Sequence, residues 1–146
     1  VRRGKEYAGR EYRGRIVDFA HHAIDRGADL VIGFGAHHPR AMELYRGRLI
    51  AYSLGNFLTI GPFDLRAPNY LSAVLQVSLD RHGELRDAQI VPIILRYPGV
   101  PSFDHKGRSI DFLRRLSKTD FPESDLELLP DGTLRVNTPD PKLVRR

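Results

Sequence analysis

The segment from residue 13 to residue 34 constrains the fold more than any other part of this 146-residue chain. Over Arg13–Arg26, apolar side chains recur at positions i, i+4, i+7 and i+8, which is the spacing of one helix face. Gly27 follows as a helix stop, and Ala28–Phe34 is an almost continuous apolar run. A helix, a glycine and a buried strand form half of a βαβ unit, so we predict an α/β fold with parallel strands.

The rest of the chain adds further strands and one more helix. We predict a second buried strand, parallel to the first, over Leu49–Leu54. The segments Ser72–Leu79 and Leu85–Leu95 flank a turn that ends in glycine, which predicts an antiparallel β-hairpin. Apolar spacing predicts a helix over Ser109–Lys118, with Ser109 as its N-cap.

Composition excludes several kinds of chemistry. The chain has no cysteine, which removes disulfides, Cys-ligated zinc and a thiol nucleophile. No apolar run approaches the ~20 residues of a membrane-spanning helix. A net charge of +5 favours acidic partners, but the basic residues are spread out and no nucleic-acid motif is present, so we expect no nucleic-acid partner.

Two pairs of adjacent histidines occupy different settings. His21 and His22 fall in the middle of the predicted first helix without a metal-binding motif, and we interpret them as surface residues. His37 and His38 follow the first buried strand. Sites in open α/β sheets form outside the carboxyl ends of strands, so His37 is either a ligand or catalytic residue or a hydrogen-bonded loop residue.

The second predicted strand is also followed by a residue with polar side-chain atoms. Gly55 permits a tight turn, and Asn56 offers both an acceptor and donors just beyond the strand. The alternative is a turn in which Asn56 bonds to its own backbone.

Residues 27–33, His37 and residues 43–57, which end in the sequence YSLGNF, resemble the bacterial poly-gamma-glutamate capsule synthesis family of the CapA type. Residues 4–7 resemble the end of that family's HWGxEY segment. The resemblance implies the C-terminal part of a calcineurin-like metallophosphoesterase αββα sandwich, with a mixed sheet and an antiparallel hairpin. We therefore expect residues 1–120 to form this part, residues 121–146 to be a Pro-rich extension, and the earlier part of the family domain to precede Val1.

The resemblance also implies site residues and partners. His37 would ligate a divalent metal ion such as Mn²⁺, and Asn56 and Glu6 would orient ligands, water or substrate. The expected substrate is an anionic polymer or a phosphate-containing compound. The family implies a cell-envelope location, with a capsule-synthesis membrane complex as partner.

Departures from the family pattern leave two interpretations open. Arg2 and Arg3 stand where the family has His and Trp, and Phe34 stands where it has the first His of a GHxxH motif. The chain is therefore either a metal-dependent phosphoesterase-like enzyme or a degenerate, non-catalytic domain that binds an anionic polymer or a partner protein through residues such as Arg2 and Arg3.

Overall fold

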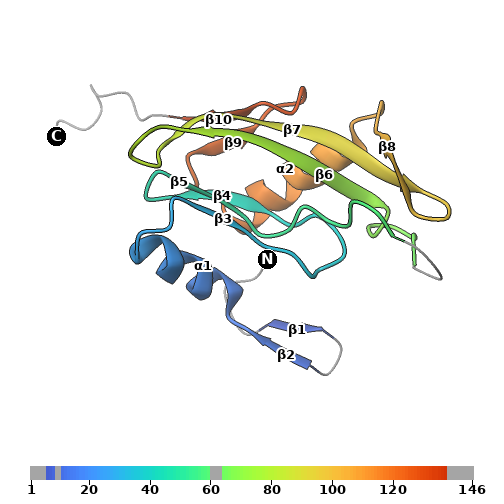
Figure 1. Ribbon diagram of the computed structural model, residues 1–146, viewed down its shortest axis with the longest axis horizontal. Helices are drawn as coiled ribbons and strands as arrows, with labels where there is room; N and C mark the ends of the chain where they lie inside the picture. Colours follow the sequence, from blue (N-terminus) through green and yellow to red (C-terminus); the bar gives the residue numbers. More distant parts are fainter. Residues whose placement is uncertain (1–5, 9–10, 60–63, 138–146) are drawn as a thin grey trace.

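The computed structural model describes residues 6–8, 11–59 and 64–137 (Figure 1). These residues form an α/β structure with one mixed sheet and antiparallel sheets. Its elements are β1 (Glu6–Ala8), β2 (Glu11–Gly14), α1 (Ile16–Asp25), β3 (Leu30–Ile32), β4 (Met42–Tyr45), β5 (Arg48–Ala51), β6 (Leu71–Leu79), β7 (Leu85–Arg96), β8 (Val100–Phe103), α2 (Arg108–Asp120), β9 (Leu126–Leu128) and β10 (Leu134–Val136). The predicted α/β class is confirmed at this level.

The mixed sheet has the strand order β3-β5-β4. Strand β3 pairs with β5 in parallel, with Val31 opposite Ile50, which confirms the predicted parallel pair. Strand β4 joins β5 as an antiparallel hairpin through a turn at Arg46 and Gly47. The sequence pattern predicts no strand at β4, because the buried Glu43 interrupts the apolar residues there.

The prediction of a buried strand over Ala28–Phe34 is wrong in the length of the strand and in the burial of its end. Strand β3 spans only Leu30–Ile32, and it is an edge strand of its sheet. Ile32 is 39% exposed, and Phe34, in the following loop, is 71% exposed. An apolar run shows which side chains of a strand could be buried. Whether they are buried depends on the elements that pack against the strand.

Strand β5 is the centre of the core because its side chains alternate between two apolar clusters. Leu49 and Ala51 face a cluster shared with β6, β7, α2 and the β9–β10 hairpin. Ile50 and Tyr52 face the opposite side and pack against α1. The mixed sheet is therefore covered by α1 on one face and by the second sheet and α2 on the other (Figure 1).

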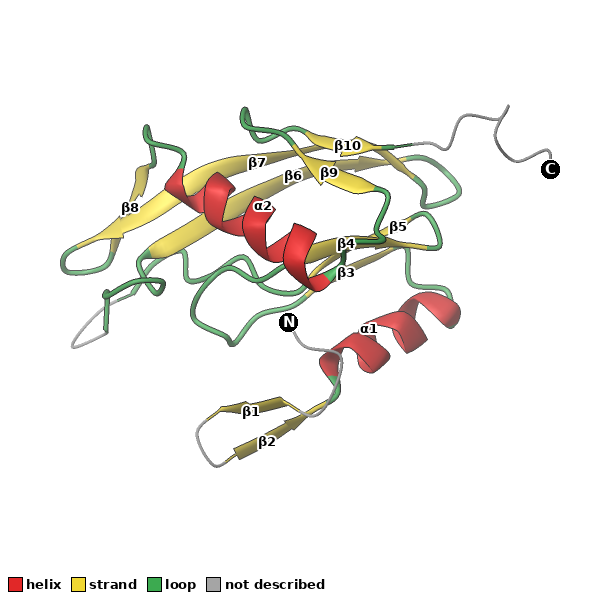
Figure 2. Cartoon of the chain, turned by 180° about the vertical axis from the view of Figure 1, so that it is seen from behind, coloured by secondary structure: helices red, strands yellow, loops and turns green. Residues whose placement is uncertain are grey.

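The second large sheet has the order β6-β7-β8 and is antiparallel throughout. It contains the predicted hairpin, in which Gly83 at the end of the turn has φ +74°. Helix α2 lies along this sheet (Figure 2) and also contacts β4 and β9. The two sheets are joined where Gly55 bridges to Ser72 and the Ala73 N–H donates to the Leu54 carbonyl, 2.9 Å.

Helix α2 begins differently from the prediction. Its N-cap is Gly107, not Ser109. Ser109 lies within the first turn, where its hydroxyl donates to the Ile93 carbonyl, 2.7 Å. The fully buried carboxylate of Asp104 accepts from the Ser109 N–H instead, 2.9 Å, and so satisfies a donor that the helix itself leaves unpaired.

We expect Asp104→Ala to lower the free energy of unfolding by about 1–2 kcal/mol, because the first turn of α2 loses its side-chain acceptor. Urea denaturation followed by circular dichroism measures the change. Asp87→Ala, at an exposed aspartate of β7, is the control and should leave the midpoint unchanged. Equal midpoints for both variants would contradict this role of Asp104.

The described residues after α2 pack onto the same core. Phe121 joins the α1 cluster, and Leu128 and Leu134 join the cluster between the sheets. Strands β9 and β10 pair as a small antiparallel hairpin around Asp131. The division of the chain at residue 120 stays a prediction, and residues 138–146 lie outside the described part. Neither of the two described helices has the length and apolar character needed to cross a membrane.

Candidate functional site

The structure brings together two predicted site residues from separate loops. His37 lies in the loop after β3, and Asn56 lies in the loop after β5. Because β3 and β5 are parallel neighbours, both loops leave the same edge of the sheet. The His37 Nδ1 atom lies 3.2 Å from the Asn56 Oδ1 atom.

This contact determines the chemistry that His37 can offer. Asn56 Oδ1 is an acceptor, so His37 donates from Nδ1 in the tautomer that carries its proton there. In that tautomer the lone pair sits on Nε2, which is the form in which an imidazole binds a metal ion or accepts a proton. His37 is exposed and has φ +64°, a backbone conformation that non-glycine residues rarely adopt and that is enriched at functional sites.

Backbone contacts hold the two loops in place. Pro39 forms a bridge to Leu54, and the Arg40 N–H donates to the Ser53 carbonyl, 2.9 Å. Gly55 has φ +81°, and a Cβ atom there would lie 2.7 Å from the Leu71 carbonyl oxygen. Only glycine fits this close approach of the loop to β6.

Asn56 also presents a donor that the described residues do not satisfy. Its Nδ2 atom is buried and has no hydrogen-bond partner among them. A buried donor left without an acceptor costs about 1–3 kcal/mol, so this amide is suited to an oxygen of a bound group.

A hollow of about 500 Å³ lies between α1 and the loop after β3. Its polar side chains are His37, His38, Arg40 and Tyr52, and most of its remaining wall is apolar. Burial, followed by the positive charge of Arg40, holds the pKa of the His38 imidazole below its usual value. His38 is therefore biased toward its neutral form beside a fixed cation.

The described residues do not by themselves fit a complete metal centre. Nowhere in the described ranges do three His, Cys, Asp or Glu side chains gather in a way that could hold a metal ion. His37 and Asn56 supply two donors, whereas catalytic zinc sites use three protein ligands and dinuclear sites use more. Phe34, at the family's other His position, has no lone pair and is exposed.

Glu6 belongs to β1, in the hairpin that precedes α1. The placement of its side chain lies outside the described part, so its predicted role stays a prediction. Arg2 and Arg3 also lie outside the described residues.

A buried polar network beneath the sheet corrects the prediction for His21. Its Nε2 atom lies 2.7 Å from Glu43 Oε1, and the Tyr52 hydroxyl donates to the same oxygen, 2.6 Å. Glu43 is only 4% exposed, and the His21 ring stacks on Tyr45 with centroids 3.8 Å apart. His21 is thus a half-buried partner of a buried carboxylate, whereas His22 is exposed as predicted. One feature of the sequence could have indicated this network. Glu43 stands between apolar residues, and a buried glutamate requires a polar partner.

Part of the sequence is similar to a family of capsule synthesis proteins. Residues 2–60 match the model of the family described as bacterial capsule synthesis protein PGA_cap. The resemblance to the CapA-type family is confirmed, as a partial match over this part of the chain.

Two curated relatives extend the match. The chain is 36% identical over 81 residues to a probable polyglutamine synthesis accessory protein of Mycobacterium tuberculosis, covering 53% of this chain and 21% of the relative. It is 39% identical over 83 residues to an uncharacterized protein of Sinorhizobium fredii, covering 47% of this chain and 17% of the relative. The chain thus spans about a fifth of the length of these relatives.

Proposed function

We propose that this protein takes part in the synthesis of a capsule polymer of the polyglutamate type, and that it does so with a metallophosphatase-like domain of the calcineurin-like sandwich class. The family match over residues 2–60 and the relative named as a polyglutamine synthesis accessory protein support the proposal. The parallel pair β3–β5, with its loops at one sheet edge, is compatible with that sandwich.

The contact between His37 and Asn56 carries the proposal at the level of the site. The two residues come from two different motif segments, 19 positions apart, and their side chains meet at 3.2 Å. In this proposal His37 Nε2 is one ligand of a divalent ion such as Mn²⁺, and Asn56 orients the imidazole. The remaining ligands lie outside the described residues. Two donors alone define no catalytic step.

We expect the full chain to bind Mn²⁺ and His37→Ala to weaken this binding at least about tenfold, because one of few ligands is lost. Electron paramagnetic resonance of free Mn²⁺ during a titration measures the affinity. His82→Ala, at an exposed histidine of the β6–β7 turn, is the matched control and should bind like the wild type. No binding by the wild type, or equal affinities for wild type and His37→Ala, would refute the metal role.

Hydrolysis of an aryl phosphate in the presence of Mn²⁺ then tests the enzymatic part of the proposal. A rate that depends on both Mn²⁺ and His37 supports a phosphoesterase-like activity of this chain. Equal rates for wild type and His37→Ala would remove that activity from the isolated chain.

A specific observation favours a second candidate function, a non-catalytic domain that binds an anionic polymer or a partner protein. Phe34 replaces a ligand of the family pattern, and Arg40 lies beside His37 in the same hollow. Arginine recognises carboxylates and phosphates without a metal. Binding of poly-gamma-glutamate that persists in a metal chelator would support this function, and binding that requires Mn²⁺ would argue for the first. The substrate, the membrane complex and the cell-envelope location all remain proposals for this chain.

A further inference from the structure

A second hollow, of about 410 Å³, lies where α1, β4 and the segment after α2 meet. Three carboxylates line it, those of Asp18, Glu43 and Glu123, and no lysine or arginine does. The whole chain carries a net charge of +5, so this hollow is acidic in a basic protein. A concave surface lined by one sign of charge attracts ligands of the opposite sign, so its occupant is a cation.

One of the three carboxylates is buried and has an oxygen without a partner. Glu43 is 4% exposed, and its hydrogen bonds from His21 and Tyr52 both end on Oε1. None of the described residues donates to Oε2, and this atom is not among those enclosed without a partner. Oε2 therefore opens into the hollow that Glu43 lines. Buried polar atoms are normally hydrogen-bonded, so Oε2 is suited to a donor on a bound group.

The other two carboxylates differ in their partners. Asp18 forms an ion pair with Arg15 on the same helix. Glu123 is exposed, and within the described part of the chain it makes neither a hydrogen bond nor an ion pair. The hollow thus offers a ligand two carboxylates, one buried and one at the surface.

A single metal ion does not match this arrangement. In the ranges that the structure describes, no three His, Asp or Glu side chains gather closely enough to hold a metal ion, although four of these residues line this hollow. The negative charges are therefore spread along the hollow. Apolar side chains of Val17, Leu44 and Phe121 complete its wall. Separated charges with apolar surface between them match an organic cation that carries two charges joined by methylenes.

We propose that this hollow binds a short aliphatic diamine. One ammonium group donates to Oε2 of Glu43, the other pairs with Glu123, and the methylenes between them lie against the apolar wall. The two hydrogen bonds to Oε1 fix the orientation of the Glu43 carboxylate before the ligand arrives, which lowers the entropic cost of binding. A monoamine would leave one of the two carboxylates unpaired.

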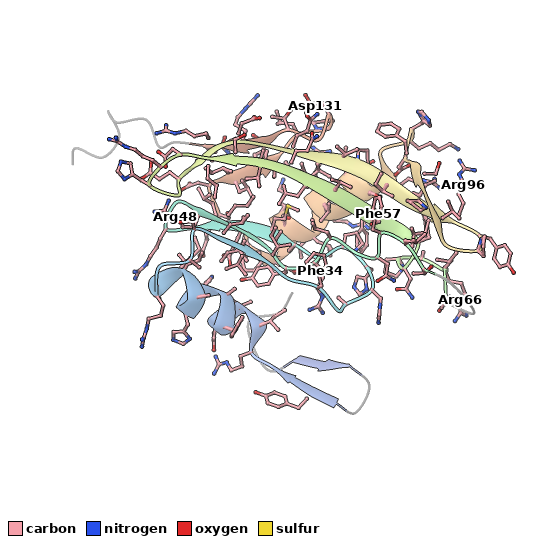
Figure 3. The ribbon with its side chains drawn as sticks, in the orientation of Figure 1. Phe34, Arg48, Phe57, Arg66, Arg96 and Asp131 are labelled. Carbon is pink, nitrogen blue, oxygen red and sulfur yellow. The ribbon has the colours of Figure 1, made fainter. Side chains whose placement is uncertain are left out.

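This hollow shares no lining residue with the hollow at His37. The exposed Phe34 and Phe57, on the loops after β3 and β5 (Figure 3), also line other hollows. Diamine binding therefore goes beyond the proposed function and does not depend on it. Mn²⁺ binding through His37 can persist when no diamine binds, and diamine binding can persist when Mn²⁺ does not bind.

Isothermal titration of the full chain with 1,4-diaminobutane, in metal-free buffer of low ionic strength, tests this proposal. We expect saturable binding, with n-butylamine at least about threefold weaker because it can meet only one carboxylate. An equal concentration of Mn²⁺ should not displace the diamine. Absence of saturable binding, equal affinities for the two amines, or displacement by Mn²⁺ would overturn the proposal.

Two variants locate the diamine. Glu43→Gln should weaken diaminobutane binding at least about tenfold, because the buried ammonium group loses a charged acceptor. Glu123→Gln should lower the affinity for diaminobutane to that for butylamine and leave butylamine binding unchanged. Glu127→Gln, at an exposed glutamate of β9 outside this hollow, is the matched control and should bind like the wild type.

Circular dichroism shows whether Glu43→Gln retains the fold. Glu123→Gln changes an exposed residue, so it decides the outcome even if Glu43→Gln does not fold. A Glu123→Gln variant that still prefers diaminobutane to butylamine as the wild type does would contradict the assigned site.

Discussion

Replacing Glu43 with alanine is expected to lower the free energy of unfolding by about 3 kcal/mol. The Glu43 carboxylate is 4% exposed, and one of its oxygens accepts from both His21 and Tyr52, at 2.7 and 2.6 Å. The variant removes both hydrogen bonds at once and leaves a cavity beneath the mixed sheet. Because His21 belongs to α1, the contact between α1 and the sheet is weakened as well.

Urea denaturation monitored by circular dichroism measures this loss for Glu43→Ala. Glu127→Ala, at an exposed glutamate of β9, is the matched control and should change the free energy of unfolding by no more than about 0.5 kcal/mol. The double variant His21→Ala/Glu43→Ala should lose less than the sum of the single variants, because the two residues share one interaction. Additive losses would show that His21 and Glu43 do not stabilise the fold as a pair.

Replacing Gly55 with alanine is expected to cost about 3 kcal/mol, from two separate sources. The backbone at Gly55 has φ +81°, which is strained for any residue with a Cβ atom. That atom would also lie 2.7 Å from the Leu71 carbonyl oxygen and 3.1 Å from the Pro39 ring. Because both neighbours belong to the backbone or to a rigid ring, the loop must move, and Asn56 moves with it.

Gly47 separates the two sources of strain. This glycine, in the β4–β5 turn, has a similar φ of +76°, but no atom lies within 4 Å of the position of a Cβ atom. Gly47→Ala should therefore cost only the conformational part, about 1 kcal/mol. Thermal and urea denaturation of both variants measure the difference in the free energy of unfolding. Equal losses for Gly55→Ala and Gly47→Ala would show that the close contact with Leu71 adds nothing to the cost. Histidine NMR signals of Gly55→Ala should also report displacement of the His37–Asn56 contact.

Local patterns predicted most of the secondary structure because those patterns act over a few residues. The helical spacing that led to Arg13–Arg26 corresponds to α1 at Ile16–Asp25. The glycine turn correctly predicted the β6–β7 hairpin. The predicted N-cap at Ser109 was wrong because its hydroxyl finds a closer acceptor on β7, and Asp104 takes over the capping contact. Ile93 lies 16 residues before Ser109, so the sequence around the helix start does not reveal this contact.

Only the part of the candidate site that follows from the direction of the strands was predictable. His37 and Asn56 follow two strands that were both predicted to be parallel, and parallel neighbours end at the same edge. The network of His21, Glu43 and Tyr52 was not predictable in this way. It depends on which face of α1 meets β4, and no spacing within either segment encodes that choice.

Sequence alone determined where the chain turns and which segments are helical or extended, because these follow from backbone preferences and apolar periodicity. It also carried the motif that relates residues 2–60 to capsule synthesis proteins. Only the tertiary structure decided which apolar residues are covered. Ile50 and Phe34 look alike in an apolar run, yet Ile50 is fully buried and Phe34 is 71% exposed. Burial is a property of the neighbours that pack against a residue, and those neighbours come from distant parts of the chain.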